Sequence, residues 1–273
     1  MPDLPPFHST IIDALMDHAG RATLPFQRAN RAEQHATAFW FNELVEETDE
    51  GAAVRQYLVT AGERTRYDMA EFTLRPELCA PAMSAEKLAM TGFAEGWIHL
   101  GDLGVAVMPD TPLYAYAARK GWSWTTDEVT DGVAATEEDI AALDGAPVPA
   151  YLLGHVDDDV DGPRGQAVVV GEIVRTDEDG VRWLGTLPQG CVGAPVFIGA
   201  GLGENSFKLV CVGVALPGEG PHPIATFDRI RAALLSVAPE RRDLAPVVTV
   251  TATTTAPEPG SVEPKRRWWR RRG

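Results

Sequence analysis

Short runs of apolar, β-prone residues recur along the first half of the chain, each bounded by Gly, Asp, Pro or charged residues. Four of them stand out, at residues 36–41, 54–60, 69–74 and 105–108. Runs of four to eight residues rich in Val, Thr, Phe, Tyr and Trp are typical of β-strands. The pattern therefore predicts strands at these four places, with an acidic turn over residues 43–51.

The second half repeats this pattern with five further runs, at residues 150–153, 166–175, 181–184, 194–198 and 207–216. Short strands at close spacing, separated by turn residues and not by long helical patterns, favour a sandwich or a barrel over repeated βαβ units. The fold class predicted from the pattern is therefore all-β.

Helical periodicity is confined to three short segments. Residues 9–19 begin with a Ser-Thr pair that suits a helix N-cap and then place Ile and Leu side chains at helical spacing. Residues 137–143 favour a single helical turn within an acidic stretch. Residues 224–237 predict a closing helix, with Ile230, Leu234 and Leu235 on one face.

The composition changes at Pro239. Pro, Thr, Val and Glu dominate from there to Pro264 without a helical period, which is typical of a disordered linker. The chain then closes with a basic, aromatic tail: Lys265, Arg266, Arg267, Trp268, Trp269, Arg270, Arg271 and Arg272.

Net charge separates this tail from the rest of the chain. The 273 residues include 39 acids and 24 Lys or Arg residues, for a net charge of −15, and six of those 24 cations lie in the tail. An acidic body repels nucleic acid and anionic membranes, so only the tail is expected to attract them. We find neither a run of 18 apolar residues nor a secretory signal, and we expect a cytoplasmic protein.

The three cysteines, Cys79, Cys191 and Cys211, predict neither a zinc site nor a disulfide framework. Their number is odd and none of them forms a CxxC pair. In a reducing compartment all three are expected to be thiols. We expect no metal and no cofactor.

The most specific motif is Gly-Cys-Val-Gly-Ala-Pro-Val-Phe at residues 190–197. It resembles the nucleophile loop G-x-S-G-G/S-P-V of trypsin-like (chymotrypsin-fold) serine proteases of the bacterial type. Glycines in such a loop allow the tight turn that aims two backbone N–H groups at one point, the oxyanion hole. The position of the serine is taken by Val192, which has no hydroxyl with which to attack a carbonyl.

Two further segments resemble the other anchors of this family, in the family's order. Residues 57–64 (YLVTAGER) match the segment that carries the catalytic histidine, with Glu63 at that position. Residues 99–109 (HLGDLGVAVMP) match the aspartate segment, with Gly104 at that position. Asp102 lies two residues earlier. The resemblance covers roughly residues 34–235 and implies that the whole catalytic triad is substituted.

The resemblance implies a fold of two six-stranded antiparallel barrels, with a short N-terminal helix and a C-terminal helix. We accordingly assign residues 1–33 to an N-terminal helix and lead-in, 34–120 to the first barrel and 121–149 to an acidic connector. Residues 150–238 form the second barrel with its closing helix, and 239–273 the linker and tail.

The function that follows is that of a catalytically inactive trypsin-like domain, or pseudoprotease, that binds a peptide or a protein. Removing one triad member costs about 10⁴-fold in rate or more. The N–H groups of Gly190 and Val192 depend on backbone shape alone, so the sequence predicts an oxyanion-like pocket that binds a carbonyl or carboxylate without cleaving it. In that hypothesis Gly193 provides the space beside the donors.

Four alternatives stay open. Cys191 is the nucleophile in an alternative active peptidase, against its interpretation as a buried, inert thiol. Glu63 and Asp102 could pair as acid and base, against an interpretation as surface carboxylates. Residues 157–162 (DDDVDG) match half of a calcium-binding loop. The tail either tethers a structural module to an anionic membrane or folds back onto the acidic body.

Overall fold

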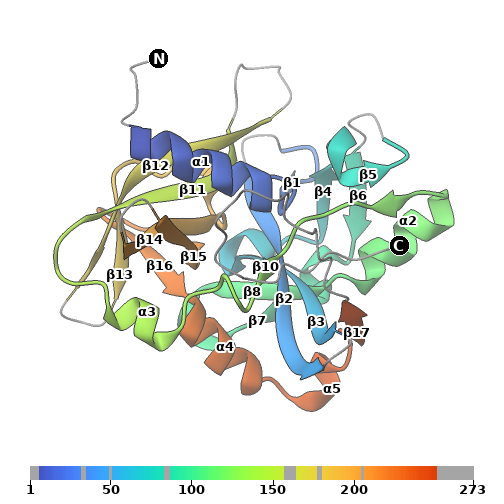
Figure 1. The fold of residues 1–273 in the computed structure, drawn as a ribbon. Coiled ribbons are helices and arrows are strands. Elements are labelled where there is room, and N and C mark those ends of the chain that lie inside the picture. Colours follow the sequence, from blue (N-terminus) through green and yellow to red (C-terminus); the bar gives the residue numbers. More distant parts are fainter. Residues whose placement is uncertain are drawn as a thin grey trace.

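The fold consists mainly of strands arranged in two large sheets (Figure 1), with a short two-stranded sheet of β5 (Cys79–Ala80) and β9 (Ser123–Trp124) beside them. The structure is a computed structural model and describes residues 6–31, 35–48, 51–82, 87–156, 164–176, 180–203 and 206–250. The basic tail at 265–272 and the acidic residues 157–162 lie outside the described residues, so the hypotheses made for them stay predictions.

The second half of the chain forms a closed antiparallel barrel with the strand order β11-β12-β13-β16-β15-β14. Pairing of Tyr151 with Phe197 joins β11 to β14 and closes the ring. Its strands are β11 (Val148–Val156), β12 (Gly165–Arg175), β13 (Val181–Leu184), β14 (Pro195–Gly203), β15 (Ser206–Ala215) and β16 (His222–Thr226).

The first half follows the same order with one interruption. Its neighbouring strands are hydrogen-bonded in the order β6-β4-β1-β2-β3-β8-β7. This is the order of the second barrel when β6 and β7 together take the place of its single strand β15. The 3₁₀ turn η3 (Phe93–Gly96) separates these two pieces. The strands are β1 (Thr23–Arg28), β2 (His35–Thr48), β3 (Gly51–Ala61), β4 (Met69–Thr73), β6 (Lys87–Thr91), β7 (Ile98–His99) and β8 (Val105–Pro109).

This shared strand order confirms the predicted all-β architecture of the trypsin-like type. The first sheet is a half-barrel and not a complete ring, because β6 and β7 do not pair with each other. It also begins earlier than expected. β1 lies within residues 1–33, which the sequence analysis assigned to a helix and lead-in. The strand was not predicted because Pro25 interrupts its apolar run, and proline is uncommon inside strands.

Helices cover the outside of the sheets. α1 (Pro6–Ala19) buries Ile11, Leu15 and Ala19, which recur every fourth residue on one face, as predicted for this segment. α3 (Glu137–Ala141) and α4 (Phe227–Leu235) lie within the other two predicted segments. The sequence analysis missed α2 (Thr111–Lys120).

Three large buried apolar clusters hold the described part of the chain together, and a small fourth one joins β17 to β3. One fills the first sheet around Trp40, Phe72 and Trp97, and a second fills the closed barrel around Leu152 and Trp183. The third lies between the two and combines Phe39 and other side chains of the first sheet with residues of the second barrel and of α4. This inter-barrel core determines the surroundings of the predicted nucleophile loop.

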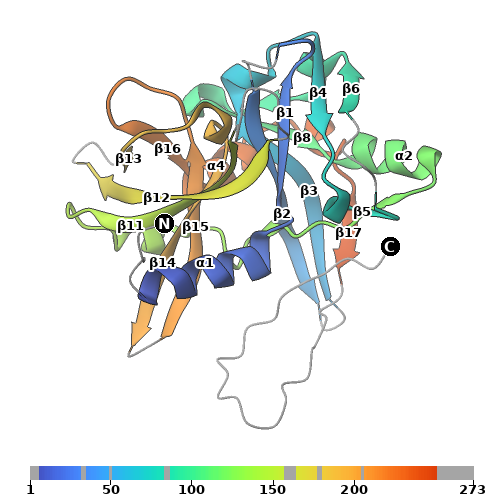
Figure 2. The ribbon, with the colours of Figure 1, turned by 90° about the horizontal axis from the view of Figure 1, so that it is seen from above.

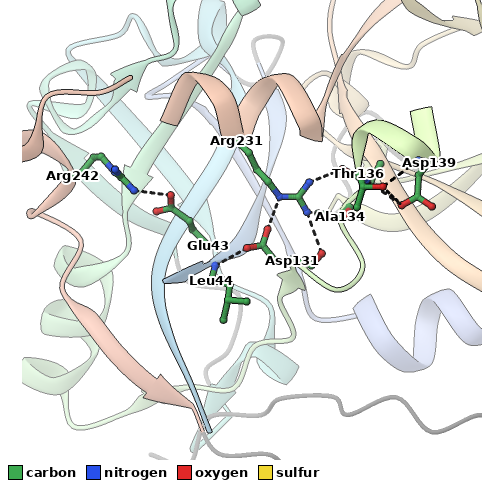
Figure 3. Close-up of polar contacts among 9 residues, drawn as sticks. Glu43, Leu44, Asp131, Ala134, Thr136, Asp139, Arg231 and Arg242 are labelled. Atoms are coloured by element: carbon green, nitrogen blue, oxygen red, sulfur yellow. Dashed lines mark hydrogen bonds and ion pairs between the residues drawn. The ribbon is translucent and has the colours of Figure 1, made fainter. Parts of the chain in front are cut away.

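The connector between the barrels is anchored on both of them. β10 (Val129–Thr130) pairs in parallel with β2, and Ala134 forms a bridge with Cys211 on β15. Arg231 on α4 clamps this segment (Figure 3). Its Nε donates to Asp131 Oδ1 at 2.6 Å, and its guanidinium also donates to the carbonyls of Asp131, Ala134 and Ala135.

Residues 239–250 correct the expectation of a disordered linker beginning at Pro239. They form α5 (Pro239–Arg242) and then β17 (Val247–Val250), which pairs antiparallel with β3 and extends the first sheet (Figure 2). Arg242 ties this segment down through a 2.9 Å ion pair with the buried carboxylate of Glu43 (Figure 3). The Pro- and Val-rich composition was misread because the strand gains its partners from distant residues.

Candidate functional site

The segment with the strongest family resemblance lies between the two barrels. The 3₁₀ turn η5 (Gln189–Cys191) leads into it and β14 leaves it. The Thr37 N–H donates to the carbonyl of Val192 at 3.0 Å, and the Gly193 N–H donates to the carbonyl of Ala215 at 2.8 Å. The loop is thus bonded to the first sheet on one side and to the second barrel on the other.

Only glycine fits at position 193, because the backbone there is left-handed and there is no room for a side chain. Its φ of +84° lies in the left-handed region that disfavours side chains. A Cβ there would overlap Thr60 Oγ1 and would lie 2.5 Å from the carbonyl oxygen of Thr37 and 2.8 Å from the amide nitrogen of Ala61. Gly193 therefore contacts β2 and β3 directly, and the space expected beside the backbone donors is occupied.

Val192 is buried, with 4% of its surface exposed. It belongs to the inter-barrel core, together with Ala61 from the first sheet and Leu216 from the second barrel. The position that corresponds to the serine of the resembling family is therefore an apolar packing position.

Of the two predicted backbone donors, Val192 has an internal acceptor and Gly190 lies at a closely packed position. The Val192 N–H donates to the carbonyl of Gln189 at 3.2 Å, within the 3₁₀ turn. Gly190 packs against the carbonyl of His155 and the ring of His35 so closely that a Cβ would not fit, and its own carbonyl accepts from Thr37 Oγ1 at 2.6 Å. Binding of a carbonyl at Val192 requires this turn to open.

The residues aligned with the family's histidine and aspartate, Glu63 and Gly104, lie on neighbouring segments next to this loop. Glu63 lies on the 3₁₀ turn η1 (Gly62–Thr65), directly after β3, and its half-exposed carboxylate pairs with Arg64 Nε at 3.1 Å. The Gly62 N–H donates to the carbonyl of Gly104 at 2.7 Å. A Cβ on Gly104 would lie 3.1 Å from Leu216 Cδ1, so the position of the family's aspartate also borders apolar side chains.

Cys191 faces the core of the second barrel. Its Sγ would lie 2.6 Å from a Cβ placed on Gly154, and the residue has no exposed surface. Burial raises the pKa of the Cys191 thiol to about 12. At neutral pH the group is therefore a protonated thiol, which is a poor nucleophile. Burial raises the pKa of Cys211 in the same direction.

Two histidines lie next to the loop, and the sequence analysis did not assign them a place there. His155 is fully buried, and its Nε2 lies 3.1 Å from Thr23 Oγ1. Burial, and secondarily the positive charge of Arg75, lower the pKa of His155 to about 3. His35 is also buried, beside Gly190. Their place is set by β2 and β11 meeting at the loop, which no local spacing reveals.

Asp102 does not join the inter-barrel core. It is exposed on the 3₁₀ turn η4 (Gly101–Leu103), at the edge of an open groove of about 610 Å³. The groove runs between residues 98–103 and residues 229–241, where α4 and α5 lie. Because its two sides are far apart in the chain, the sequence analysis did not anticipate it. No contact between Glu63 and Asp102 supports an acid–base pair.

Within the described ranges, no group of three or more His, Cys, Asp or Glu side chains is placed to hold a metal ion. In the same ranges no helix has the length and apolar character needed to cross a membrane.

Comparisons with known proteins find similarity in structure only. No family model and no curated protein matches the sequence. Solved structures that resemble the chain include Deg5 (TM-score 0.47, 10% identity, 84% of this chain and 94% of that one). The HtrA-type protease AlgW with a tripeptide has a TM-score of 0.46 and 13% identity over 89% of this chain and 69% of that one.

A third is catalytically inactive tobacco etch virus protease complexed with substrate, at a TM-score of 0.46 and 8% identity over 86% of this chain and 89% of that one. The neighbours thus include trypsin-like and HtrA-type proteases at low identity. The architecture assigned to this chain rests on the matching strand order of its two sheets.

Proposed function

We propose that this chain is a catalytically inactive trypsin-like domain, a pseudoprotease, whose function is to bind a peptide or a protein. The observation that carries the proposal is the burial of Val192 in the inter-barrel core, to which Ala61 and Leu216 also belong. A serine protease needs a nucleophile that substrate reaches at this position.

The surroundings of Val192 support inactivity on separate grounds. The Val192 N–H donates to Gln189 and is not available to stabilise an oxyanion. Glu63 is paired with Arg64 on the surface, and Gly104 carries no side chain. Cys191 has a raised pKa and points into a barrel core, which argues against the alternative active peptidase.

Binding through the old substrate cleft has a specific structural cost. A peptide carbonyl that accepts from the Val192 N–H must first break the bond to Gln189, and it gains a bond of the same kind in return. The exchange offers little net free energy. A binding surface outside the closed loop therefore fits the structure better.

The proposal is tested by turnover. The full chain and the Val192→Ser variant are incubated with a proteome-derived peptide library, and new termini are identified by mass spectrometry. We expect no cleavage by either protein, because the variant regains a hydroxyl without a base to activate it. Sequence-specific cleavage by the unmodified chain, absent from a Cys191→Ala variant, would overturn the proposal in favour of the alternative active peptidase.

A further inference from the structure

The groove beside α4 combines an apolar floor with a basic rim. Its floor continues the inter-barrel core through Ile98, Leu100, Leu103, Ala233 and Val237. Its rim carries polar groups from both sides: His99, Asp102, Arg229, Ser236 and Arg241.

Two of the rim groups are unpaired cations. Arg229 and Arg241 are both exposed, and neither guanidinium forms a hydrogen bond or an ion pair with another described residue. In contrast, Arg231 and Arg242, their neighbours in sequence, are both held by carboxylates. Asp102 is the one carboxylate in the lining of the groove.

The lining of the groove holds two arginines and one carboxylate, although the chain as a whole carries a net charge of −15. His99 lies in the same lining. Partial burial and the nearby charges of Arg66 and Arg241 all lower the pKa of its imidazole. Its Nε2 lies 3.4 Å from Thr65 Oγ1. A positive, partly apolar groove on an acidic protein is a candidate for binding an anionic ligand.

We propose that this groove binds an acidic peptide segment, with apolar side chains on the floor and Asp or Glu side chains at Arg229 and Arg241. The inference rests on the proposed function, because it assumes that the domain acts by binding. Guanidinium groups hold carboxylates through paired, charge-assisted hydrogen bonds. The volume of about 610 Å³ lies within the range of sites that hold small ligands or short chain segments.

The chemistry of the rim favours acidic side chains over the C-terminus of a peptide. A terminal carboxylate is commonly captured by converging backbone N–H groups, whereas acidic motifs are recognised by clusters of arginine side chains. The cations of this groove are long side chains at its edge. They reach carboxylates that remain partly solvated while the apolar side chains between them are buried.

Two variants of α4 and α5 remove the proposed contacts, and matched controls exist on α2. Arg229→Glu combined with Arg241→Glu reverses the charge of the rim, and Ala232→Trp fills the groove from an exposed helical position. Arg119→Glu combined with Lys120→Glu, and separately Ala118→Trp, make the same changes at exposed positions of α2, away from the groove.

The experiment uses the full chain and two libraries of acetylated, amidated octapeptides, one with apolar residues between Asp and Glu and one with Asn and Gln in their place. We expect acidic peptides to bind and neutral ones to bind at least tenfold more weakly. The charge reversal and Ala232→Trp should each weaken binding at least tenfold, and the two controls should change it less than twofold.

The ionisation of His99 gives a second readout at the groove itself. A bound acidic peptide offsets the charges of Arg66 and Arg241, so the pKa of His99 should rise, as measured by NMR titration of the imidazole with and without peptide. Acidic peptides that bind equally to the charge-reversed protein and leave His99 unchanged would overturn the inference and leave the proposed function standing. Failure to bind any peptide of either library would also overturn the inference, whereas the proposed function is overturned only by turnover in the cleavage experiment.

Discussion

The nucleophile loop and the groove beside α4 border the same inter-barrel core, yet they differ in every property that a binding site needs. Val192 lies in an apolar core, the Val192 and Gly193 N–H groups have internal acceptors, and a Cβ on Gly193 would not fit. At the groove the core reaches the surface, the space is open and two guanidinium groups have no partner among the described residues. The loop is thus packed between the two barrels whereas the groove is open, as the proposed binding function requires.

The largest effect should follow from substitution of Gly193. Gly193→Leu forces a side chain into a left-handed backbone and against Thr60 and Thr37, which should destabilise the fold by about 3–5 kcal/mol. Gly101 offers a control at the groove. Its φ of +54° is also left-handed, but no atom lies within 4 Å of the place that a Cβ would occupy. Gly101→Ala should cost about 1–2 kcal/mol in urea denaturation. Equal costs would show that the loop is not tightly packed.

Val192→Ser should destabilise the protein by about 2–3 kcal/mol, because it removes buried methyl groups and introduces a hydroxyl among apolar side chains. The same change at the partly exposed Val237 of the groove should cost less than half as much. Thermal unfolding of the two variants decides this. A stable Val192→Ser protein would mean that the position is open to solvent.

The fold class and the position of the loop could be predicted from the sequence. The spacing of short apolar runs predicted an all-β fold, the resemblance to the trypsin-like family implied two barrels, and residues 190–197 located the loop. The groove was not predictable, because residues 98–103 and 229–241 meet only after the closing helix docks. β17 was not predicted for the same reason, because the strand with which it pairs, β3, lies nearly two hundred residues earlier in the chain. Local patterns predicted elements and missed what distant elements form together.

Arg231 is bonded to a carboxylate and to backbone carbonyls, whereas Arg229 is exposed and has no partner among the described residues. Arg231→Met loses the bonds that clamp the connector and leaves Asp131 without its cation, which should cost about 2 kcal/mol. Arg229→Met removes an exposed, unpaired cation and should change stability by less than about 0.5 kcal/mol. Chemical denaturation of both variants measures the difference. Equal effects would contradict the role of Arg231 as a clamp.

His155 predicts a smaller, pH-dependent effect in the region of the loop. Its pKa is lowered to about 3 by burial and by Arg75, whereas in the unfolded chain it takes its ordinary value of 6.5. Between these values the unfolded chain binds a proton that the folded chain does not. Stability should therefore fall as the pH decreases from about 6.5, by up to about 1.4 kcal/mol per pH unit from this group.

The slope is measured by urea denaturation between pH 7 and pH 4.5. A His155→Asn variant should show a shallower dependence than the unmodified chain, whatever its absolute stability. A His99→Asn variant should change the slope less, because His99 is exposed at the groove. Identical slopes for all three proteins would show that His155 titrates freely in the folded state.

The central claim, that the position of the serine is closed and without catalytic chemistry, is tested most directly by covalent probes. The full chain is treated with a fluorophosphonate and, separately, with iodoacetamide, and adducts are mapped by mass spectrometry with active trypsin as a positive control. We predict no fluorophosphonate adduct, and alkylation of Cys191 far slower than that of free cysteine, because its pKa is raised to about 12. A stoichiometric adduct on residues 189–195 in the native protein would contradict the account.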